Sequence, residues 1–226
     1  MNAFAKPSGL RLIVLTVLLV SAGCVLVFGA FLVRRAQREA RRSNAYGRLC
    51  QMRLALQNYE QQYGALPAIC LRDKQGKPIH SWRALILPYL DFESIKRLDL
   101  SQSWNSDYNR KVIDSIPVGE WTWFARDRPL DQSPARTHIL ALLGPSSIWD
   151  VTTGLPKGRT HERANTILLI SVPESSIEPL QPSDITEDEL CKMVEDGHEI
   201  LFIMADAPNG YGIVTIEGGA LAFHNW

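Results

Sequence analysis

A long uncharged apolar segment near the N-terminus constrains this chain more than any other feature. Residues 12–33 read LIVLTVLLVSAGCVLVFGAFLV and contain no charged side chain. As a helix rising 1.5 Å per residue they extend roughly 33 Å, enough to cross the hydrocarbon core of a bilayer. A cleaved signal peptide is the alternative, but its apolar region is shorter, about 7–15 residues, and ends in a small-x-small site. Here the segment runs directly into Arg34 and Arg35, so we predict a retained transmembrane helix that contacts the lipid bilayer.

The residues after this segment are strongly basic. Glu39 is the single acid among seven arginines, at positions 34, 35, 38, 41, 42, 48 and 53. The whole chain nevertheless balances 24 Lys and Arg against 24 Asp and Glu, so it has no chain-wide basic field. We interpret the run as a solvated helix face beside the membrane, with contact to lipid headgroups or nucleic acid as the alternatives. Because no aromatic residues are interleaved with the arginines, we predict no nucleic-acid partner.

Beyond the arginines the apolar residues follow a helical period. Steps of three and four separate Leu49, Met52, Leu56, Tyr59 and Tyr63. This stripe predicts an amphipathic helix that buries one face. Gly64 and Pro67 follow as stop signals. No proline interrupts residues 9–63, so we predict one continuous helix of about 50 residues.

The segment ARRSNAYGRLCQMRLALQNYEQQYGALP, residues 40–67, resembles a planctomycete-type family of prepilin-like proteins of unknown function. In that family an N-terminal pilin helix leads into a small C-terminal domain. The resemblance covers residues 9 to about 210 and is weakest between 117 and 160. The matching positions in the quoted segment are Arg41, Arg42, Ser43, Leu49, Gln51, Leu54, Ala55, Leu56, Asn58, Tyr59, Tyr63, Gly64 and Pro67.

The resemblance also places the prepilin signature G-F-T-L-I-E on residues 9–14, where Val14 replaces the glutamate. In type IV pilins that carboxylate is thought to pair with the amino terminus of a neighbouring subunit, and a buried carboxylate needs such a partner. Valine cannot supply the pairing. The change at Val14 favours a pilin-type helix used as a simple anchor, and a minor pseudopilin cleaved after Gly9 is the alternative.

The orientation of the chain rests on two opposing arguments. The arginines that follow the apolar segment would place the C-terminal side in the cytoplasm by the positive-inside rule. Pilin-type proteins instead carry their C-terminal domain outside the cytoplasmic membrane. We follow the resemblance and expect a single-pass protein of the cytoplasmic (inner) membrane with a periplasmic or otherwise extracytoplasmic domain. A Cys70–Cys191 disulfide would suit that compartment, although spacing alone leaves the pairing open.

Several local patterns predict the elements of the C-terminal domain. In HSWRALILPYLD, residues 80–91, Ser81 caps a short helix through Leu87, and Trp82–Arg83 is interpreted as core packing, with ligand stacking as the alternative. A helix is expected over 187–194, because Thr186 and Glu189 form a capping box. Strands are expected in residues 120–127, 137–149, 164–175, 199–206, 213–217 and 218–226.

Motifs for catalysis or metal binding are missing from the sequence. It contains no G-x-S-x-G, P-loop, H-E-x-x-H or G-x-G-x-x-G. Asp107 is the only strong oxygen ligand near the SWNSDYN turn, and an acid–base pair of His198 with Asp196 or Asp206 is the remaining enzyme hypothesis. We predict no enzyme and no catalytic, cofactor or metal residues. Relative to the family, polar signature positions have changed at Val14, His161, Glu162, Ser171 and Ala207.

Together these inferences predict an α+β protein in which the long N-terminal helix packs on a mainly antiparallel, pilin-like β-sheet. We expect a membrane-anchored pilin-like protein with a structural or interaction role in an extracytoplasmic assembly, with protein partners of a secretion or pilus-like kind. The alternative is a tethered solute- or glycan-binding module with Trp104, Trp121, Trp123 and Trp149 in one open groove. The expected division is a tail at 1–11, a transmembrane helix at 12–33, a basic then amphipathic helix at 34–64 and a soluble domain at 65–226.

Overall fold

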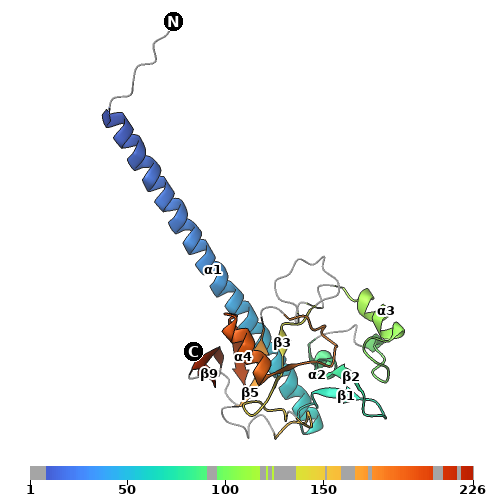
Figure 1. The fold of residues 1–226 in the computed structure, drawn as a ribbon. Coiled ribbons are helices and arrows are strands. Elements are labelled where there is room, and N and C mark those ends of the chain that lie inside the picture. The colour runs from blue at the N-terminus through green and yellow to red at the C-terminus, as the bar shows by residue number, and fades with distance from the viewer. Residues whose placement is uncertain are drawn as a thin grey trace. The chain divides into compact units, whose positions relative to one another are not determined.

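The N-terminal helix α1 is one unbroken helix of 55 residues, Gly9–Tyr63, as Figure 1 shows. The continuous helix predicted from the absence of proline is therefore confirmed. It ends at Gly64, whose φ of 81° is readily adopted by glycine and whose N–H donates to the Glu60 carbonyl at 2.8 Å. The computed structural model describes residues 9–90, 96–117, 121, 124, 136–150, 152–158, 166–172, 175–205, 211–217 and 220–225, without the side chains of 9–12, 216 and 225.

Contacts divide the chain into two compact units, Met1–Ser43 and Asn44–Trp226. The first unit contains the apolar part of α1 and the arginines that follow it. The second unit contains the last five turns of α1 and every other element.

The second unit is built on a five-stranded sheet with the order β3-β5-β7-β8-β9. All neighbouring strands in it are antiparallel, which confirms the mainly antiparallel sheet and the α+β class. The strands are β3 (Ile139–Leu140), β5 (Ile167–Ser171), β7 (Ile200–Met204), β8 (Tyr211–Glu217) and β9 (Ala220–Asn225).

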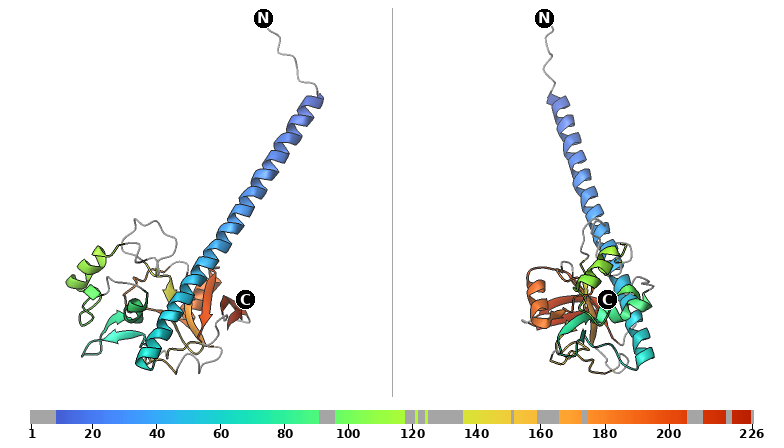
Figure 2. Two further views of the ribbon diagram at one scale, coloured as in Figure 1. Left: turned by 180° about the vertical axis from the view of Figure 1, so that it is seen from behind. Right: turned by 90° about the vertical axis from the view of Figure 1, so that its right-hand side faces the viewer.

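Helices cover both faces of this sheet. On one face the C-terminal part of α1 forms one apolar cluster with strand residues such as Leu169 and Ile203. On the other face Ile170 and Phe202 pack in a second cluster with Leu190 of α4 (Glu187–Glu195), the helix beside the strands in Figure 2. Alternate side chains of a strand point to opposite faces, and both faces are covered, so all five residues of β5 are buried.

The predicted stripe on α1 is confirmed for most of its length and wrong at its end. Leu49, Met52 and Leu56 have no exposed surface, and Tyr59 is half-buried. Tyr63 is 62% exposed and lies against Tyr59 with tilted rings, 4.4 Å between ring centroids. The chain turns away at Gly64, and the buried position beyond the helix is taken by Leu66, which is 3% exposed.

The helix predicted after His80 is also present. Ser81 caps α2 (Trp82–Ile86) by accepting a hydrogen bond from the Arg83 N–H, and a 3-10 turn η1 (Leu87–Tyr89) follows. Ser106 caps α3 (Asp107–Ser115), and Thr186 with Glu189 forms the predicted capping box of α4. The caps at Ser81 and Thr186 are local features, which explains why residue order alone predicted them.

Three strands were not predicted, and one predicted strand is wrong where it is described. The unpredicted strands are β1 (Cys70–Arg72) and β2 (Pro78–Ser81), which form an antiparallel hairpin, and β6 (Ile185–Thr186), which pairs in parallel with β4 (Leu142–Leu143). In the segment 120–127 the Phe124 N–H donates to the Trp121 carbonyl at 2.9 Å, which closes a turn. The rest of that segment, Trp123 included, lies outside the described residues.

All four cysteines are free thiols, at positions 24, 50, 70 and 191. The Cys70–Cys191 disulfide considered from the sequence is therefore not formed in this structure.

Candidate membrane interface

The first unit exposes a long apolar surface. Its large apolar side chains between Ile13 and Val33 are 47–74% exposed. The helix has a mean hydropathy of 2.6 in its most apolar window, and it is the one helix among the described residues that is long and apolar enough to cross a membrane. Apolar patches of this size on a protein mark contact with a membrane or another protein.

The few polar groups in this segment are bonded within the helix. The Thr16 hydroxyl donates to the Ile13 carbonyl at 2.8 Å, and the Ser21 hydroxyl donates to the Leu18 carbonyl at 2.9 Å. Such bonds satisfy a hydroxyl where no water is available. The predicted apolar segment therefore has the surface chemistry of a candidate membrane-spanning helix.

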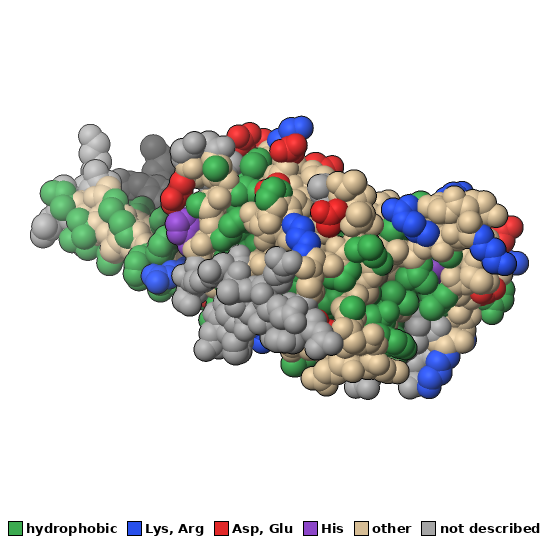
Figure 3. Space-filling model, turned by 90° about the horizontal axis from the view of Figure 1, so that it is seen from below, with side chains coloured by type: hydrophobic (Ala, Val, Ile, Leu, Met, Phe, Trp, Pro, Cys, Tyr) green, Lys and Arg blue, Asp and Glu red, His purple; other side chains and the backbone are tan. Residues whose placement is uncertain are grey.

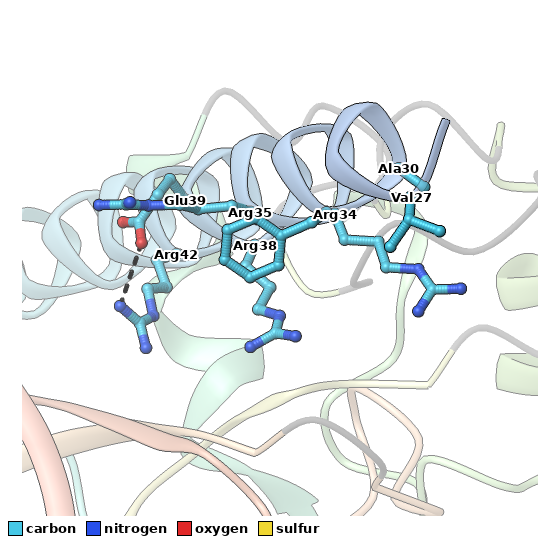
Figure 4. A pocket seen from close by; sticks show the side chains of 8 residues that line it. Val27, Ala30, Arg34, Arg35, Arg38, Glu39 and Arg42 are labelled. Carbon is cyan, nitrogen blue, oxygen red and sulfur yellow. Dashed lines mark hydrogen bonds and ion pairs between the residues drawn. The ribbon is translucent and has the colours of Figure 1, made fainter. Parts of the chain in front are cut away.

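The arginines that follow lie on one side of the helix. At 3.6 residues per turn, Arg34, Arg35, Arg38, Arg41 and Arg42 fall within an arc of about 120°. We call these five residues the arginine face. Figure 4 shows Arg34, Arg38 and Arg42 projecting from the same side of α1.

A groove joins this face to the apolar segment. Its lining combines the apolar side chains of Val27, Ala30 and Phe31 with Arg34, Arg35, Arg38, Glu39 and Arg42 (Figure 4). The Arg42 Nη1 atom lies 3.4 Å from Glu39 Oε1, and both side chains are partly exposed, at 27% and 57%. An exposed pair of this kind contributes at most about 1 kcal/mol, and Glu39 offsets only one of the five positive charges.

The surface seen in Figure 3 differs from this face, because basic and acidic side chains are interspersed across it. Mixed charges produce a weak local potential, whereas charges of one sign on one helix face add up. The arginine face is therefore the strongest candidate interaction surface for an anionic partner.

The second unit contains a buried ion pair. Arg83 Nη2 lies 2.5 Å from Asp184 Oδ1, and the two side chains are 0% and 2% exposed. Arg83 also donates to the carbonyl of Ile139 at 3.0 Å and to the hydroxyl of Ser81 at 2.6 Å. These bonds connect α2 with β3 and with the segment before β6. Core packing of Trp82–Arg83 is confirmed, because neither side chain has exposed surface for a stacked ligand.

Burial and the bonds within the pair have opposite effects on the pKa of each partner. Burial raises the pKa of Asp184, while Arg83, the Ala141 N–H and the Trp82 indole lower that pKa. Burial likewise lowers the pKa of Arg83, and Asp184 opposes that change. Three donors converge on Asp184 Oδ1, at 2.5 Å from Arg83, 2.8 Å from Ala141 and 3.3 Å from Trp82. Burial therefore raises the pKa of Asp184 overall, and the three donors favour its carboxylate form against that effect.

A cavity of about 170 Å³ lies beside this pair, lined in part by Ile69, Cys70 and Pro78. Ligand pockets for small molecules usually hold about 300–1,000 Å³. The cavity is therefore too small for most solutes.

The tryptophans considered for a binding groove do not form one where they are described. Trp149 is fully buried, donates its indole N–H to the Pro67 carbonyl at 3.0 Å and lies beside Trp82. Trp121 is 5% exposed. Trp104 is half-buried, with the Arg110 guanidinium 5.4 Å from its ring. The buried rings serve packing, so the groove of the alternative hypothesis is not present among them.

The structure describes only some of the other candidate residues. Asp107 is exposed in the first turn of α3, and His198 is half-buried after α4. Asp206, His161, Glu162 and Ala207 lie outside the described residues. Within the described part of the chain, no three His, Cys, Asp or Glu side chains are grouped so that they could hold a metal ion.

The sequence did not reveal that Arg83 and Asp184 are partners. The available signal was a charge inside the apolar run that includes Trp82 and Leu87, because an arginine buried there requires a carboxylate. The partner is 101 positions away, and local patterns cannot select it among the acids of the chain.

The fold and this surface define the class of the chain: it is an α+β protein with a candidate membrane-spanning helix near its N-terminus. The model of a family described as "Protein of unknown function (DUF1559)", SBP_bac_10, matches residues 35–168, more than half of the chain. The chain belongs to this family, and its predicted membership in a family of unknown function is confirmed. No curated protein and no solved structure matches it.

Proposed function

We propose that this chain is a membrane-anchored, pilin-like protein of the cytoplasmic membrane, with a non-catalytic structural or interaction role in an extracytoplasmic assembly. One observation carries the proposal. A single helix, α1, has an exposed apolar half and then supplies the buried residues Leu49, Met52 and Leu56 to the core of the second unit. One helix that serves both as anchor and as core element is the arrangement that the pilin resemblance implies.

The N-terminal end of α1 supports an anchor more than a filament subunit. Val14, at the position of the prepilin glutamate, is apolar and 50% exposed. An apolar side chain at this depth is favourable in lipid, whereas an unpaired carboxylate would be costly. The proposed protein therefore keeps a pilin-type helix for membrane attachment alone.

The polar groups in the core of the second unit support a structural role. Asn109 accepts from the Asp99 N–H and donates to the carbonyls of Asp99 and Ser103, each at 2.9 Å. Arg83 and Asp184 are bonded to each other and to nearby backbone. Buried polar groups committed in this way hold loops in place and are not available to a substrate.

The test combines membrane topology with N-terminal sequencing. A reporter fused after Trp226 and active only outside the cytoplasm is expected to be active, and the purified chain is expected to keep its original N-terminus. A mature N-terminus at Leu10 would instead indicate a processed pseudopilin. A reporter active only in the cytoplasm would refute the extracytoplasmic role and would show that the arginines determine orientation.

The assembly role requires a second measurement. Light scattering of the chain solubilised in mild detergent is expected to give a protein mass above the 25.4 kDa of one chain. The same sample in a denaturing detergent provides the single-chain control. A protein mass of one chain under both conditions, with no accompanying protein, would contradict a role in an assembly.

A further inference from the structure

We propose that the arginine face binds the phosphates of anionic phospholipids at the end of the membrane span. The inference rests on the proposed function, in that residues 13–33 must cross the bilayer. It adds the partner: a lipid with a negatively charged headgroup and acyl chains, held along one side of α1.

The position of the arginines along the helix fits this partner. Arg34 directly follows Val33, the last residue of the apolar segment, and Arg42 lies about 12 Å further along the helix axis. The headgroup layer on each side of the hydrocarbon core is about 5–7 Å thick. Side chains on a helix point back toward its N-terminus, so Arg38, Arg41 and Arg42 lean toward the membrane end of α1. The guanidinium groups therefore concentrate at the depth of the phosphates.

The position of the arginines around the helix fits as well. At 100° per residue, the apolar lining residues Val27, Ala30 and Phe31 fall on the same side of α1 as the arginine face. The opposite side carries the small residues Ala36, Ala40 and Ser43 instead. One strip of the helix thus offers apolar contact for an acyl chain and, directly beyond it, positive charge for a phosphate.

The chemistry of the side chains favours a phosphate. A guanidinium is planar, stays charged at all relevant pH values and donates two parallel hydrogen bonds to a phosphate. Arg34, Arg35, Arg38 and Arg41 are exposed, and Arg42 is partly exposed. A soluble phosphate or a nucleic acid has no acyl chain and would leave the apolar part of the groove unused. This charge and shape complementarity selects an anionic phospholipid.

The test measures which lipids surround the full chain. The chain is reconstituted into phosphatidylcholine vesicles that contain trace spin-labelled phosphatidylglycerol or spin-labelled phosphatidylcholine, and electron paramagnetic resonance gives the relative association of the two lipids. We expect the anionic lipid to be preferred by about fivefold, the preference that one arginine near an anionic surface contributes. The triple variant Arg34→Gln, Arg35→Gln, Arg38→Gln should lower this preference, because only Arg41 and Arg42 of the arginine face remain.

A matched variant separates the arginine face from net charge. The triple variant Lys74→Gln, Lys77→Gln, Lys111→Gln removes the same number of positive charges from exposed positions of the second unit. It should keep the full preference. An equal loss in both triple variants would overturn the proposal, because net charge alone would then account for the effect.

Further outcomes distinguish failure of the lipid site from failure of the membrane span that it requires. Extraction of the wild-type chain from vesicles by alkaline carbonate would overturn both, because the apolar helix would not span. Retention without any preference for the anionic lipid would overturn the lipid site alone. Arginine-dependent binding of a single-stranded oligonucleotide without lipid preference would overturn it in favour of nucleic acid. In 1 M salt, where screening acts over about 3 Å, the expected preference shrinks.

Discussion

Replacing Asp184 by asparagine removes the counter-charge of a fully buried guanidinium. The substitution keeps the size of the side chain and an oxygen that can still accept from the Ala141 N–H and the Trp82 indole. Arg83 keeps its bonds to Ser81 and Ile139 but has no anion within its buried environment. The change therefore isolates the charge of the carboxylate.

The structure sets the size of the expected effect. With side chains 0% and 2% exposed, removing one partner of the pair should cost about 3–5 kcal/mol. In a unit of this length 1 kcal/mol shifts the melting temperature by about 2–4 °C, so Asp184→Asn should lower it by about 6–20 °C. Thermal unfolding of the chain in mild detergent, followed by tryptophan fluorescence, measures the shift.

Two further variants separate buried charge from other causes of destabilisation. Glu178→Gln removes the charge that pairs with Arg110 at 2.6 Å and with Arg136 at 3.8 Å, but these side chains are more exposed, at 14% for Glu178 and 31% and 35% for the arginines. It should cost no more than about 1 kcal/mol. The double variant Arg83→Met, Asp184→Asn should be more stable than Asp184→Asn alone, because no charge remains buried. Equal destabilisation by Glu178→Gln and Asp184→Asn, or no recovery in the double variant, would show that buried charge is not the cause.

Three other predictions concern α1 and the buried histidine. Leu56→Ala should lower the free energy of unfolding by about 2–5 kcal/mol, while Leu54→Ala, at a side chain 48% exposed, should change it by less than about 0.5 kcal/mol; similar costs in denaturant titrations would contradict docking of α1. Gly47→Ala has open space around the added Cβ and should stabilise the helix by about 0.5–1 kcal/mol, whereas Gly64→Ala, at a φ of +81°, should destabilise by about 1 kcal/mol; the same melting assay separates the signs. Burial lowers the pKa of His80, so its contribution to stability is present above the unfolded-state pKa of about 6.5 and is lost as pH falls toward the lowered value. The melting temperature should drop more between pH 7.5 and 5.5 in the wild type than in His80→Gln, and parallel curves would exclude this histidine as the cause.

Residue order was sufficient for the features that depend on near neighbours. The long helix followed from an apolar run, a period of three and four, and the absence of proline, and its end followed from Gly64. The caps at Ser81 and Thr186 followed from hydroxyl side chains directly before helical segments. Each of these features depends on groups within about four positions, because a helical hydrogen bond joins residues four apart.

The sequence predicted the arginine face as a basic segment. That its arginines share one side of α1 followed only once the helix was established. The sequence shows seven arginines close together, and helix geometry places five of them within one arc once the helix is known to be continuous. The groove that joins them to Val27, Ala30 and Phe31 became visible only in the structure. The position of a side chain around a helix can be assigned only once the helix is known, whereas charges can be counted from the sequence alone.

The sequence by itself determined the long apolar helix, its amphipathic continuation, the strands of strongest apolar character and the membership in a family of unknown function. Only the tertiary structure decided that Arg83 pairs with Asp184 across 101 positions, that β5 is covered on both faces, and that Tyr63 is exposed while Leu66 is buried. The physical reason is the range of the interactions. Helix periodicity and capping act between neighbours along the chain, whereas burial and ion pairing depend on which distant segments the fold brings together.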